Sequence, residues 1–279
     1  MAEGRREFEF SDANFERIRQ FVSENTGITL SDKKKNMVYG RLSKRLRKGE
    51  YGDFDAFCQA LESGDEAEQE FMINAITTNL TAFFRENHHF TYLENTLIPE
   101  LLTKKSHDKR LRIWSAGCST GEEAYSIAMI LQESIAEIDE WDIKILATDL
   151  DANVIAQGQA GIYRADCLTD IPNDRIKRWF RRGRGEKSGL VKVSSELQKM
   201  IRFKRLNLLG QWPMQGPFDL IFCRNVVIYF DKEIQKKLFD RYADILSSDA
   251  HLFIGHSETL YKVTTRFDSL GQTIYRKNS

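Results

Sequence analysis

The chain has 279 residues, enough for two domains that each bury a hydrophobic core. Its 41 basic and 41 acidic residues balance, so the net charge selects no polyanionic partner. No apolar run approaches the roughly 20 residues of a membrane-spanning helix, and the charged N-terminus lacks the apolar segment of a secretory signal. We therefore expect a cytoplasmic protein without membrane insertion.

The four cysteines are far apart in the sequence and form no CxxC pair, so we expect free thiols. The five histidines match no zinc motif. His88 and His89 are adjacent, and consecutive residues on a helix do not face one another. The sequence therefore predicts no metal site.

Residues 1–95 are predicted to form a helical N-terminal domain and a linker, because this part of the chain contains no convincing strand pattern. The predicted helical segments run from Ser11 or Asp12 to Gly27, from Thr29 to Gly49, from Phe54 to Ser63, and from Glu66 to Thr77.

The second of these segments carries a basic stripe. Its apolar face is formed by Val38, Leu42 and Leu46, which are four residues apart. On another face, the spacing of one stripe is shared by Arg41, Lys44, Arg45 and Lys48. A solvated helix face and a docking surface for an acidic partner explain this stripe equally well.

From residue 96 onward, short apolar runs alternate with amphipathic helical segments. The runs are Leu111–Trp114, Ile143–Ala147, Phe218–Phe222 and His251–Gly255, and two more follow between Arg266 and Lys277. This alternation predicts a parallel α/β sheet, and the last pair predicts a closing antiparallel hairpin. We expect residues 96–279 to form a second domain around a doubly wound sheet.

The segment 178–203 interrupts the alternation. It contains three glycines, is locally basic, and holds two short apolar runs, Leu190–Val193 and Ile201–Phe203. We predict a small antiparallel β insertion, which is where a fold often carries its partner-specific parts.

A glycine-containing loop follows the first strand of the second domain. Gly117 and Gly121 lead directly to Glu122 and Glu123 at the start of a helix. Helix N-termini in this position bind the pyrophosphate of dinucleotides, but two carboxylates would repel it. S-adenosylmethionine fits better, because it has no phosphate and a carboxylate attracts its sulfonium and ammonium groups.

Asp149 ends the second strand, where an acid can hydrogen-bond both ribose hydroxyls of a nucleoside. A lone acid at a strand end is often only a helix cap, but the preceding glycine loop favours a role in ligand binding. Asp151 is the residue expected to cap the following helix.

Four longer motifs make the pattern more specific. In chain order they are TTNLTAFFRE (Thr77–Glu86), WSAGCSTGEEAYSIA (Trp114–Ala128), FDLIFCRNVVIYFD (Phe218–Asp231) and GHSE (Gly255–Glu258). With these motifs in this order, the chain resembles the CheR-type chemotaxis receptor methyltransferases over essentially its whole length. The resemblance implies a class I methyltransferase-like doubly wound sheet with a closing hairpin and a small β insertion, preceded by an all-helical domain.

The resemblance also implies an activity. Such an enzyme is an S-adenosylmethionine-dependent protein-glutamate O-methyltransferase, which esterifies glutamates on chemoreceptor signalling domains for sensory adaptation and releases S-adenosylhomocysteine. The cofactor-binding residues that it implies are Asn79, Thr81, Arg85, Glu122, Asp149, Asn207, Leu208, Arg224 and Asn225. Arg85 and Tyr229 are similar to residues that act near the transferring methyl group, whereas His256 is assigned no role.

A glutamate substrate is already ionised near neutral pH, so the expected mechanism needs alignment and charge placement rather than a general base. With this function, the basic stripe would dock acidic receptor helices. The insertion at 178–203 would bind a receptor C-terminal peptide as an added strand.

Two alternatives remain. A nucleic-acid methyltransferase would also use a basic helix, but the chain has no Asn/Asp-Pro-Pro-aromatic tetrad, and no aromatic residues interleave with the stripe. A non-catalytic adaptor that senses the cofactor is disfavoured because Arg85 and Tyr229 are both present.

Overall fold

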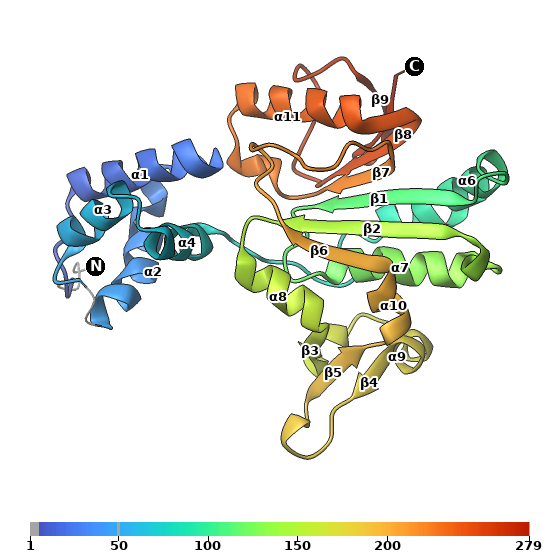
Figure 1. Ribbon diagram of the computed structural model, residues 1–279, viewed down its shortest axis with the longest axis horizontal. Helices are drawn as coiled ribbons and strands as arrows, with labels where there is room; N and C mark the ends of the chain where they lie inside the picture. Colours follow the sequence, from blue (N-terminus) through green and yellow to red (C-terminus); the bar gives the residue numbers. More distant parts are fainter. Residues whose placement is uncertain (1–5, 49–50, 279) are drawn as a thin grey trace. The chain divides into compact units, whose positions relative to one another are not determined.

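The computed structural model describes residues 6–48 and 51–278 of the chain. The predicted features at residues 1–5 and at Gly49 lie outside the described residues. The chain divides into two compact units, one of residues 1–78 with 229–234 and one of residues 79–228 with 235–279 (Figure 1). We had placed the boundary near residue 95, whereas the structure divides the chain after Thr78, because Phe83 and Phe90 are buried in the core of the second unit.

The first unit is helical. Its helices are α1 (Asp12–Thr26), α2 (Lys35–Arg47), α3 (Phe54–Glu62) and α4 (Glu66–Ile76), with a 3-10 turn at Asp32–Lys34. Ser11 caps α1 by accepting the backbone N–H of Asn14, and Gly27, with φ of 70°, ends the helix, as predicted. The second helix begins at Lys35 rather than near Thr29, because the 3-10 turn precedes it.

Part of the predicted basic stripe is used inside the first unit. Arg45 forms an ion pair with the buried carboxylate of Glu68. Nη1 of Arg41 donates to the backbone carbonyls of Ala75 and Thr77, at 2.9 Å each. Lys44 and Lys48 are exposed. Only the two lysines of the stripe are therefore exposed to solvent. Its two arginines hold α2 against α4 and against the residues that follow α4.

The second unit is built on a seven-stranded sheet of order β6-β2-β1-β7-β8-β10-β9 (Figure 1). Its strands are β1 (Arg110–Ala116), β2 (Asp142–Asp149), β6 (Ile201–Arg205), β7 (Phe218–Cys223), β8 (Leu246–Ile254), β9 (Phe267–Gly271) and β10 (Ile274–Lys277). The first five of that order are parallel, and β10 is antiparallel to β8 and β9, which confirms the predicted parallel sheet and closing hairpin. The strand order reverses between β1 and β7, and ligands of such sheets bind beside the carboxyl ends of the strands at this point.

Helices cover both faces of this sheet. The helices that follow α4 are α5 (His88–Tyr92), α6 (Ile98–Lys104), α7 (Glu122–Ser134), α8 (Ala152–Ala160), α9 (Asn173–Trp179), α10 (Ser195–Met200) and α11 (Lys232–Ile245), and a π-helical turn (Leu93–Leu97) joins α5 to α6. Side chains alternate across a strand. Ile113 of β1 accordingly lies in a core shared with Ile127 of α7, whereas the ring of Trp114 packs on Tyr242 of α11, with ring centroids 5.3 Å apart.

A separate small sheet has the order β3-β5-β4, with β3 (Ile162–Arg164), β5 (Leu190–Val193) and β4 (Phe180–Arg182) all antiparallel. The predicted insertion at 178–203 exists but begins earlier, at β3. The assignment of Ile201–Phe203 to this insertion is wrong, because these residues form β6 and pair in parallel with β2. An apolar run of this kind suits either sheet, and only the pairing partner decides between them.

All four cysteines are free, as predicted. Cys167 is exposed, whereas Cys58, Cys118 and Cys223 are buried. Within the described ranges, we find no helix with both the length and the apolar character needed to cross a bilayer.

Candidate functional site

The loop between β1 and α7 turns sharply at the carboxyl edge of the sheet. The backbone N–H groups of Gly117 and Cys118 both donate to the carbonyl of Thr148 at the end of β2, at 2.8 and 2.9 Å. Gly117 has φ of 87°, and a Cβ atom there would lie 2.3 Å from Cγ2 of Val226. Only glycine therefore permits this close approach of the β1 loop to the loop after β7.

A chain of hydrogen bonds links the ends of β1 and β2 to residue 79. Oδ2 of Asp149 accepts the backbone N–H of Ser119 at 2.8 Å, and Oγ of Ser119 donates to the carbonyl of Asn79 at 2.9 Å. The amide of Asn79 donates to Oδ2 of Asp151 at 2.8 Å, and Asp151 caps α8 as predicted. Burial raises the pKa of Asp149, and hydrogen bonds from the backbone N–H groups of Asp151 and Ser119 oppose this shift. The structure therefore brings the predicted residues Asn79 and Asp149 to one place.

The two acids that begin α7 have different surroundings. Glu123 accepts the hydroxyl of Ser115 at 2.7 Å and pairs with Nη1 of Arg224 at 3.0 Å. Glu122 accepts the hydroxyl of Thr120 at 2.6 Å and its own backbone N–H, and it forms no ion pair within the described part of the chain. Burial raises the pKa of Glu122. Glu122 is thus a buried carboxylate beside the glycine loop whose charge no side chain of the second unit balances.

Arg224 is the centre of a buried ion network. It follows β7 and is only 6% exposed. Besides Glu123, it lies 3.3 Å from Oε2 of Glu86 and donates to the carbonyl of Arg85. Burial alone raises the pKa of Glu86, but a hydrogen bond from His256, the charge of Arg224 and other donors outweigh this effect and lower it to about 2. The charge of Arg224 is therefore used to hold three segments of the second unit together.

The two residues predicted near the transferring methyl group belong to different units. Nη1 of Arg85, in the second unit, donates to the carbonyl of Leu80 at 2.7 Å. Tyr229 belongs to the first unit, where its carbonyl accepts the backbone N–H of Thr29 at 2.9 Å. Thr81 is half-buried in the segment between α4 and α5.

The residues predicted to flank the adenine lie just after β6. Oδ1 of Asn207 accepts the N–H of Leu209 at 3.0 Å, and Leu208 is buried. No pattern in the sequence pointed to Arg241 of α11, which donates to the carbonyl of Leu208 at 2.7 Å and stacks 3.8 Å from the ring of Trp212. Arg241 thus anchors this segment from a helix more than thirty positions away in the chain.

The sequence also left Glu258 without a role, although it ends the GHSE motif. Its buried carboxylate accepts backbone N–H groups of Asn225, Val227, Ile228 and Gly255. The signal that could have found it was the motif itself, because a carboxylate just after a strand end is suited to accept several backbone N–H groups.

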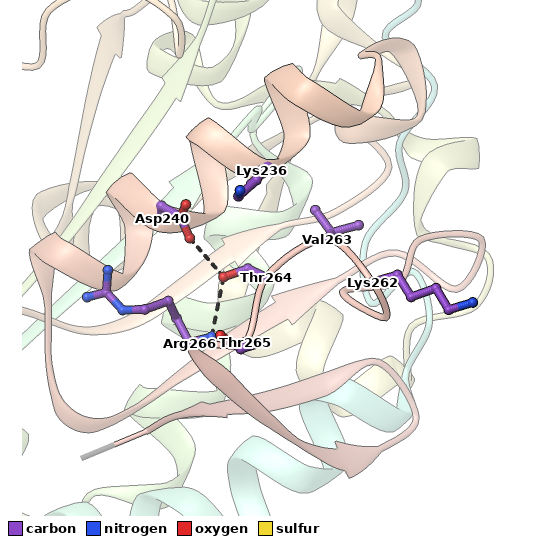
Figure 2. Close-up of a pocket in the computed structure, with 7 residues that line it drawn as sticks. All are labelled: Lys236, Asp240, Lys262, Val263, Thr264, Thr265 and Arg266. Atoms are coloured by element: carbon purple, nitrogen blue, oxygen red, sulfur yellow. Dashed lines mark hydrogen bonds between the residues drawn. The ribbon is translucent and has the colours of Figure 1, made fainter.

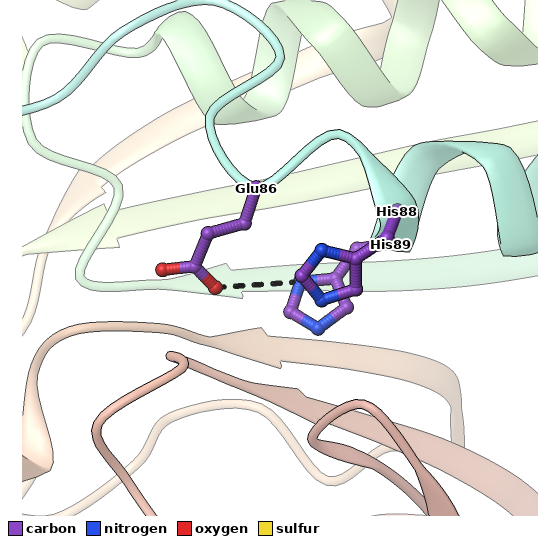
Figure 3. Close-up of side chains that lie close together, drawn as sticks. All are labelled: Glu86, His88 and His89. Carbon is purple, nitrogen blue, oxygen red and sulfur yellow. Dashed lines mark ion pairs between the residues drawn. The ribbon is translucent and has the colours of Figure 1, made fainter.

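Glu86, His88 and His89 form a group of side chains close enough to share a metal ion, and Figure 3 shows them pointing toward one another. The rings of His88 and His89 have centroids 4.1 Å apart, so our expectation that they do not face one another is wrong. Both rings contact the carbonyl of Gln272, which brings them together at the start of α5. A divalent cation on Glu86 would be repelled by the guanidinium of Arg224 on the same carboxylate. We therefore interpret the group as part of the ion network.

A cavity of about 470 Å³ lies between α11 and the segment just before β9. Figure 2 shows the side chains that line it. It is lined by Lys236, Asp240, Lys262, Val263, Thr264, Thr265 and Arg266. Thr264 donates to Asp240 at 2.8 Å inside it, and Lys262 points away from the other lining side chains (Figure 2). None of the predicted site residues lines this cavity.

Family models and known relatives match nearly the whole chain. Residues 13–77 match the all-alpha domain of CheR methyltransferases, and residues 79–276 match the SAM binding domain of CheR methyltransferases. The chemotaxis protein methyltransferase of Escherichia coli (strain K12) is 43% identical over 268 residues, which cover 95% of this chain and 91% of that protein. Chemotaxis protein methyltransferase 2 of Pseudomonas aeruginosa is 40% identical over 273 residues, covering 98% of this chain and 95% of that protein. The chemotaxis protein methyltransferase of Borreliella burgdorferi is 38% identical over 267 residues, covering 94% of this chain and 93% of that protein.

These matches confirm the predicted fold class and the predicted cofactor, S-adenosylmethionine. They extend over both units, and the two matched domains meet where the structure divides the chain, between residues 77 and 79. The chain therefore belongs to the CheR methyltransferase family and is a methyltransferase with an S-adenosylmethionine-binding domain.

Proposed function

We propose that this chain transfers a methyl group to glutamate side chains on the signalling domains of chemoreceptors, as a protein-glutamate O-methyltransferase in sensory adaptation. Support comes from its family and from relatives named chemotaxis protein methyltransferases. We expect it to act in the cytoplasm, where its four free cysteines would stay reduced.

The observation that carries this proposal is the unequal pairing of the two acids of α7. Glu123 is neutralised by Arg224, whereas Glu122 has no cationic partner in the described part of the second unit. A buried carboxylate without such a partner is costly unless a ligand supplies the positive charge. S-adenosylmethionine carries an ammonium and a sulfonium. The carboxylate of Glu122 would attract these positive charges, whereas it would repel a phosphate.

We propose further contacts to the cofactor from residues at the same edge of the sheet. Asp149 would hold the ribose, and Asn207 with Leu208 would flank the adenine. Asn79 and Thr81 would contact the cofactor from the segment between α4 and α5, and Asn225 from the loop after β7. Arg224 would act through the shape of the pocket, because its charge is already paired with Glu86 and Glu123.

The methyl transfer requires the protein mainly to align the glutamate carboxylate with the methyl group of the cofactor. Bound S-adenosylmethionine supplies a methyl group on a cationic sulfur. The glutamate of the receptor is already ionised, so no residue of this chain has to remove a proton from it. The proposed task of Arg85 or Tyr229 is to orient that carboxylate or the cofactor, while the buried network around Arg224 keeps water away from the reacting groups.

A labelled-methyl transfer assay tests the proposed function. Purified chain, methyl-labelled S-adenosylmethionine and chemoreceptor signalling domains should give labelled receptor that releases methanol in alkali, because a glutamate methyl ester hydrolyses there. The receptor with its glutamates replaced by alanine should stay unlabelled. Alkali-stable label, label on DNA in a parallel arm, or binding of S-adenosylhomocysteine without any transfer would each contradict the proposal.

The exposed lysines of α2 are proposed to dock acidic receptor helices. Reversing both charges, with Lys44→Glu and Lys48→Glu, should lower the rate of receptor methylation at low salt about tenfold, because electrostatic attraction speeds association. The difference should shrink at high salt, where surface charges are screened. Methylation rates measured across a salt series check this. The matched control is Lys236→Glu with Lys237→Glu, which makes the same charge change on α11, where both lysines are exposed. An equal loss in this control would contradict a specific docking role.

The small sheet is proposed to bind a receptor C-terminal peptide. Its strand β4 is an edge strand, and its residues Arg181 and Arg182 are exposed. An acidic peptide added as a further strand would satisfy the backbone groups of this edge. Fluorescence anisotropy should show micromolar binding at low salt. A peptide with proline at alternate positions lacks the N–H donors and should bind much more weakly. No binding, or equal binding of the proline peptide, would contradict the proposal that a receptor peptide is added to β4 as a further strand.

A further inference from the structure

The GHSE segment follows β8, and its last residue makes an unusual set of contacts. Glu258 is 6% exposed. One oxygen of its carboxylate accepts the backbone N–H groups of Val227 and Ile228, at 2.9 and 3.3 Å. The other accepts those of Asn225 and Gly255, at 3.0 and 2.5 Å. One side chain thus satisfies three donors of the loop after β7 and one donor of its own segment.

These donors need that carboxylate. The chain leaves β7 in a left-handed turn, with Asn225 at φ of 59°, so its next N–H groups cannot continue the strand's ladder. Val227 is buried, and buried N–H groups without acceptors are strongly disfavoured in folded proteins. The shape of the loop from Asn225 to Ile228 therefore depends on a side chain that lies some thirty residues further along the chain.

Asn225 is held from two further sides. Its amide donates to Oε1 of Glu86 at 3.3 Å, and because the pKa of Glu86 is lowered to about 2, that carboxylate is ionised and only accepts. The amide nitrogen of Asn225 must therefore face Glu86, and its carbonyl oxygen faces away from it. A Cβ atom on Gly255 would lie 2.4 Å from the amide nitrogen of Asn225, so the GHSE segment approaches this side chain as closely as glycine allows.

We propose that Glu258 is a positioning residue for methyl transfer, which holds the loop Asn225–Ile228 in the shape that the reaction requires. This inference rests on the proposed function. The loop lies at the carboxyl edge of the sheet beside the β1 loop, carries Asn225, and leads directly to Tyr229. Glu258 touches none of the reacting groups and acts through the backbone of that loop.

The variant Glu258→Gln tests this role. Glutamine keeps the size of the side chain but has an NH₂ group in place of one acceptor oxygen. This NH₂ group cannot accept the backbone N–H groups that the lost oxygen accepted. Amide hydrogen exchange of the peptide covering Asn225–Ile228 should lose its protection. The kcat of receptor methylation should fall at least tenfold. The Kd for S-adenosylhomocysteine should rise by a clearly smaller factor, because among the proposed cofactor contacts Asn225 lies on this loop, whereas Glu122 begins α7 and Asp149 ends β2.

The matched control is Glu133→Gln on α7. Glu133 is also a carboxylate with several partners. It accepts hydrogen bonds from Nε1 of Trp179 at 2.7 Å and from Nε of Arg175 at 3.0 Å, but it lies at the C-terminal end of α7. This variant should lose thermal stability and keep the protection of residues 225–228 and the kcat. If the Gln variant does not fold, Glu258→Asp keeps the charge but is one methylene shorter, and the same readouts apply.

Unchanged protection in a folded Glu258 variant would overturn the inference, and so would lost protection with unchanged kcat or an equal loss of kcat in Glu133→Gln. Hydrogen exchange is measured without a methyl acceptor, so its result does not depend on the substrate. A wild-type chain that labels no receptor would instead refute the proposed function and leave the exchange result standing.

Discussion

Replacing Arg224 by methionine is expected to lower the free energy of unfolding of the second unit by about 3–5 kcal/mol, because removing one partner of a buried ion network leaves uncompensated charges. The buried Glu123 and the half-buried Glu86 would both lose their cationic partner, and the carbonyl of Arg85 would lose a donor. Urea unfolding followed by far-ultraviolet circular dichroism measures this loss.

The control for this prediction is Arg266→Met, which removes an arginine from an exposed pair with Asp244 at 3.0 Å. Exposed pairs contribute about 0–1 kcal/mol, so this variant should unfold close to the wild type. Adding Glu123→Gln to Arg224→Met should recover part of the stability, because one of the stranded charges is then absent. Equal losses for the two arginines would show that the network around Arg224 is not what stabilises this unit.

Glu122→Gln is expected to weaken the binding of S-adenosylhomocysteine by roughly 10- to 100-fold, because a charge-assisted hydrogen bond to a buried carboxylate contributes about 1.5–3 kcal/mol. The glutamine is isosteric and keeps an acceptor for Thr120, so the loop should keep its shape. Isothermal titration calorimetry of the purified variant gives the Kd directly.

A second ligand separates the charge of Glu122 from a general effect on the pocket. 5′-Methylthioadenosine has the adenosine and the sulfur but no ammonium, so wild type and Glu122→Gln should bind it with similar affinity. Glu133→Gln, on the same helix, should bind both ligands as the wild type does. If Glu122→Gln lost both ligands equally, Glu122 would be holding the loop rather than the methionine portion of the cofactor.

Much of the architecture could be predicted because it depends on local patterns. The cap at Ser11, the left-handed Gly27 and the cap at Asp151 are properties of a few neighbouring residues, and the structure has all three. The parallel strands and the closing hairpin followed from alternating apolar runs. The wrong assignment was Ile201–Phe203, where two sheets compete for the same kind of run and the choice depends on Ile145 of β2, far away in the chain.

The site shows the same division. The residue types at the sheet edge, two acids after a glycine loop and an acid after the second strand, indicated a cofactor with adenosine and positive charge before any fold was known. Which acid is free to meet that charge could not be read from two adjacent glutamates. Arg224, about a hundred residues later, neutralises Glu123, whereas Glu122 has no ion-pair partner among the residues that the structure describes. The basic stripe was likewise visible, but only packing against α4 and the chain after it showed that Arg41 and Arg45 are used internally.

The sequence by itself therefore determined the family, the class of cofactor and the order of strands and helices, because these depend on residue type and spacing along the chain. The tertiary structure decided which charges are paired, where the two units divide, and that Glu258 holds the loop after β7. Those properties depend on distances between residues that are remote in sequence. A charge or a backbone N–H group has no partner until folding brings one within hydrogen-bond reach.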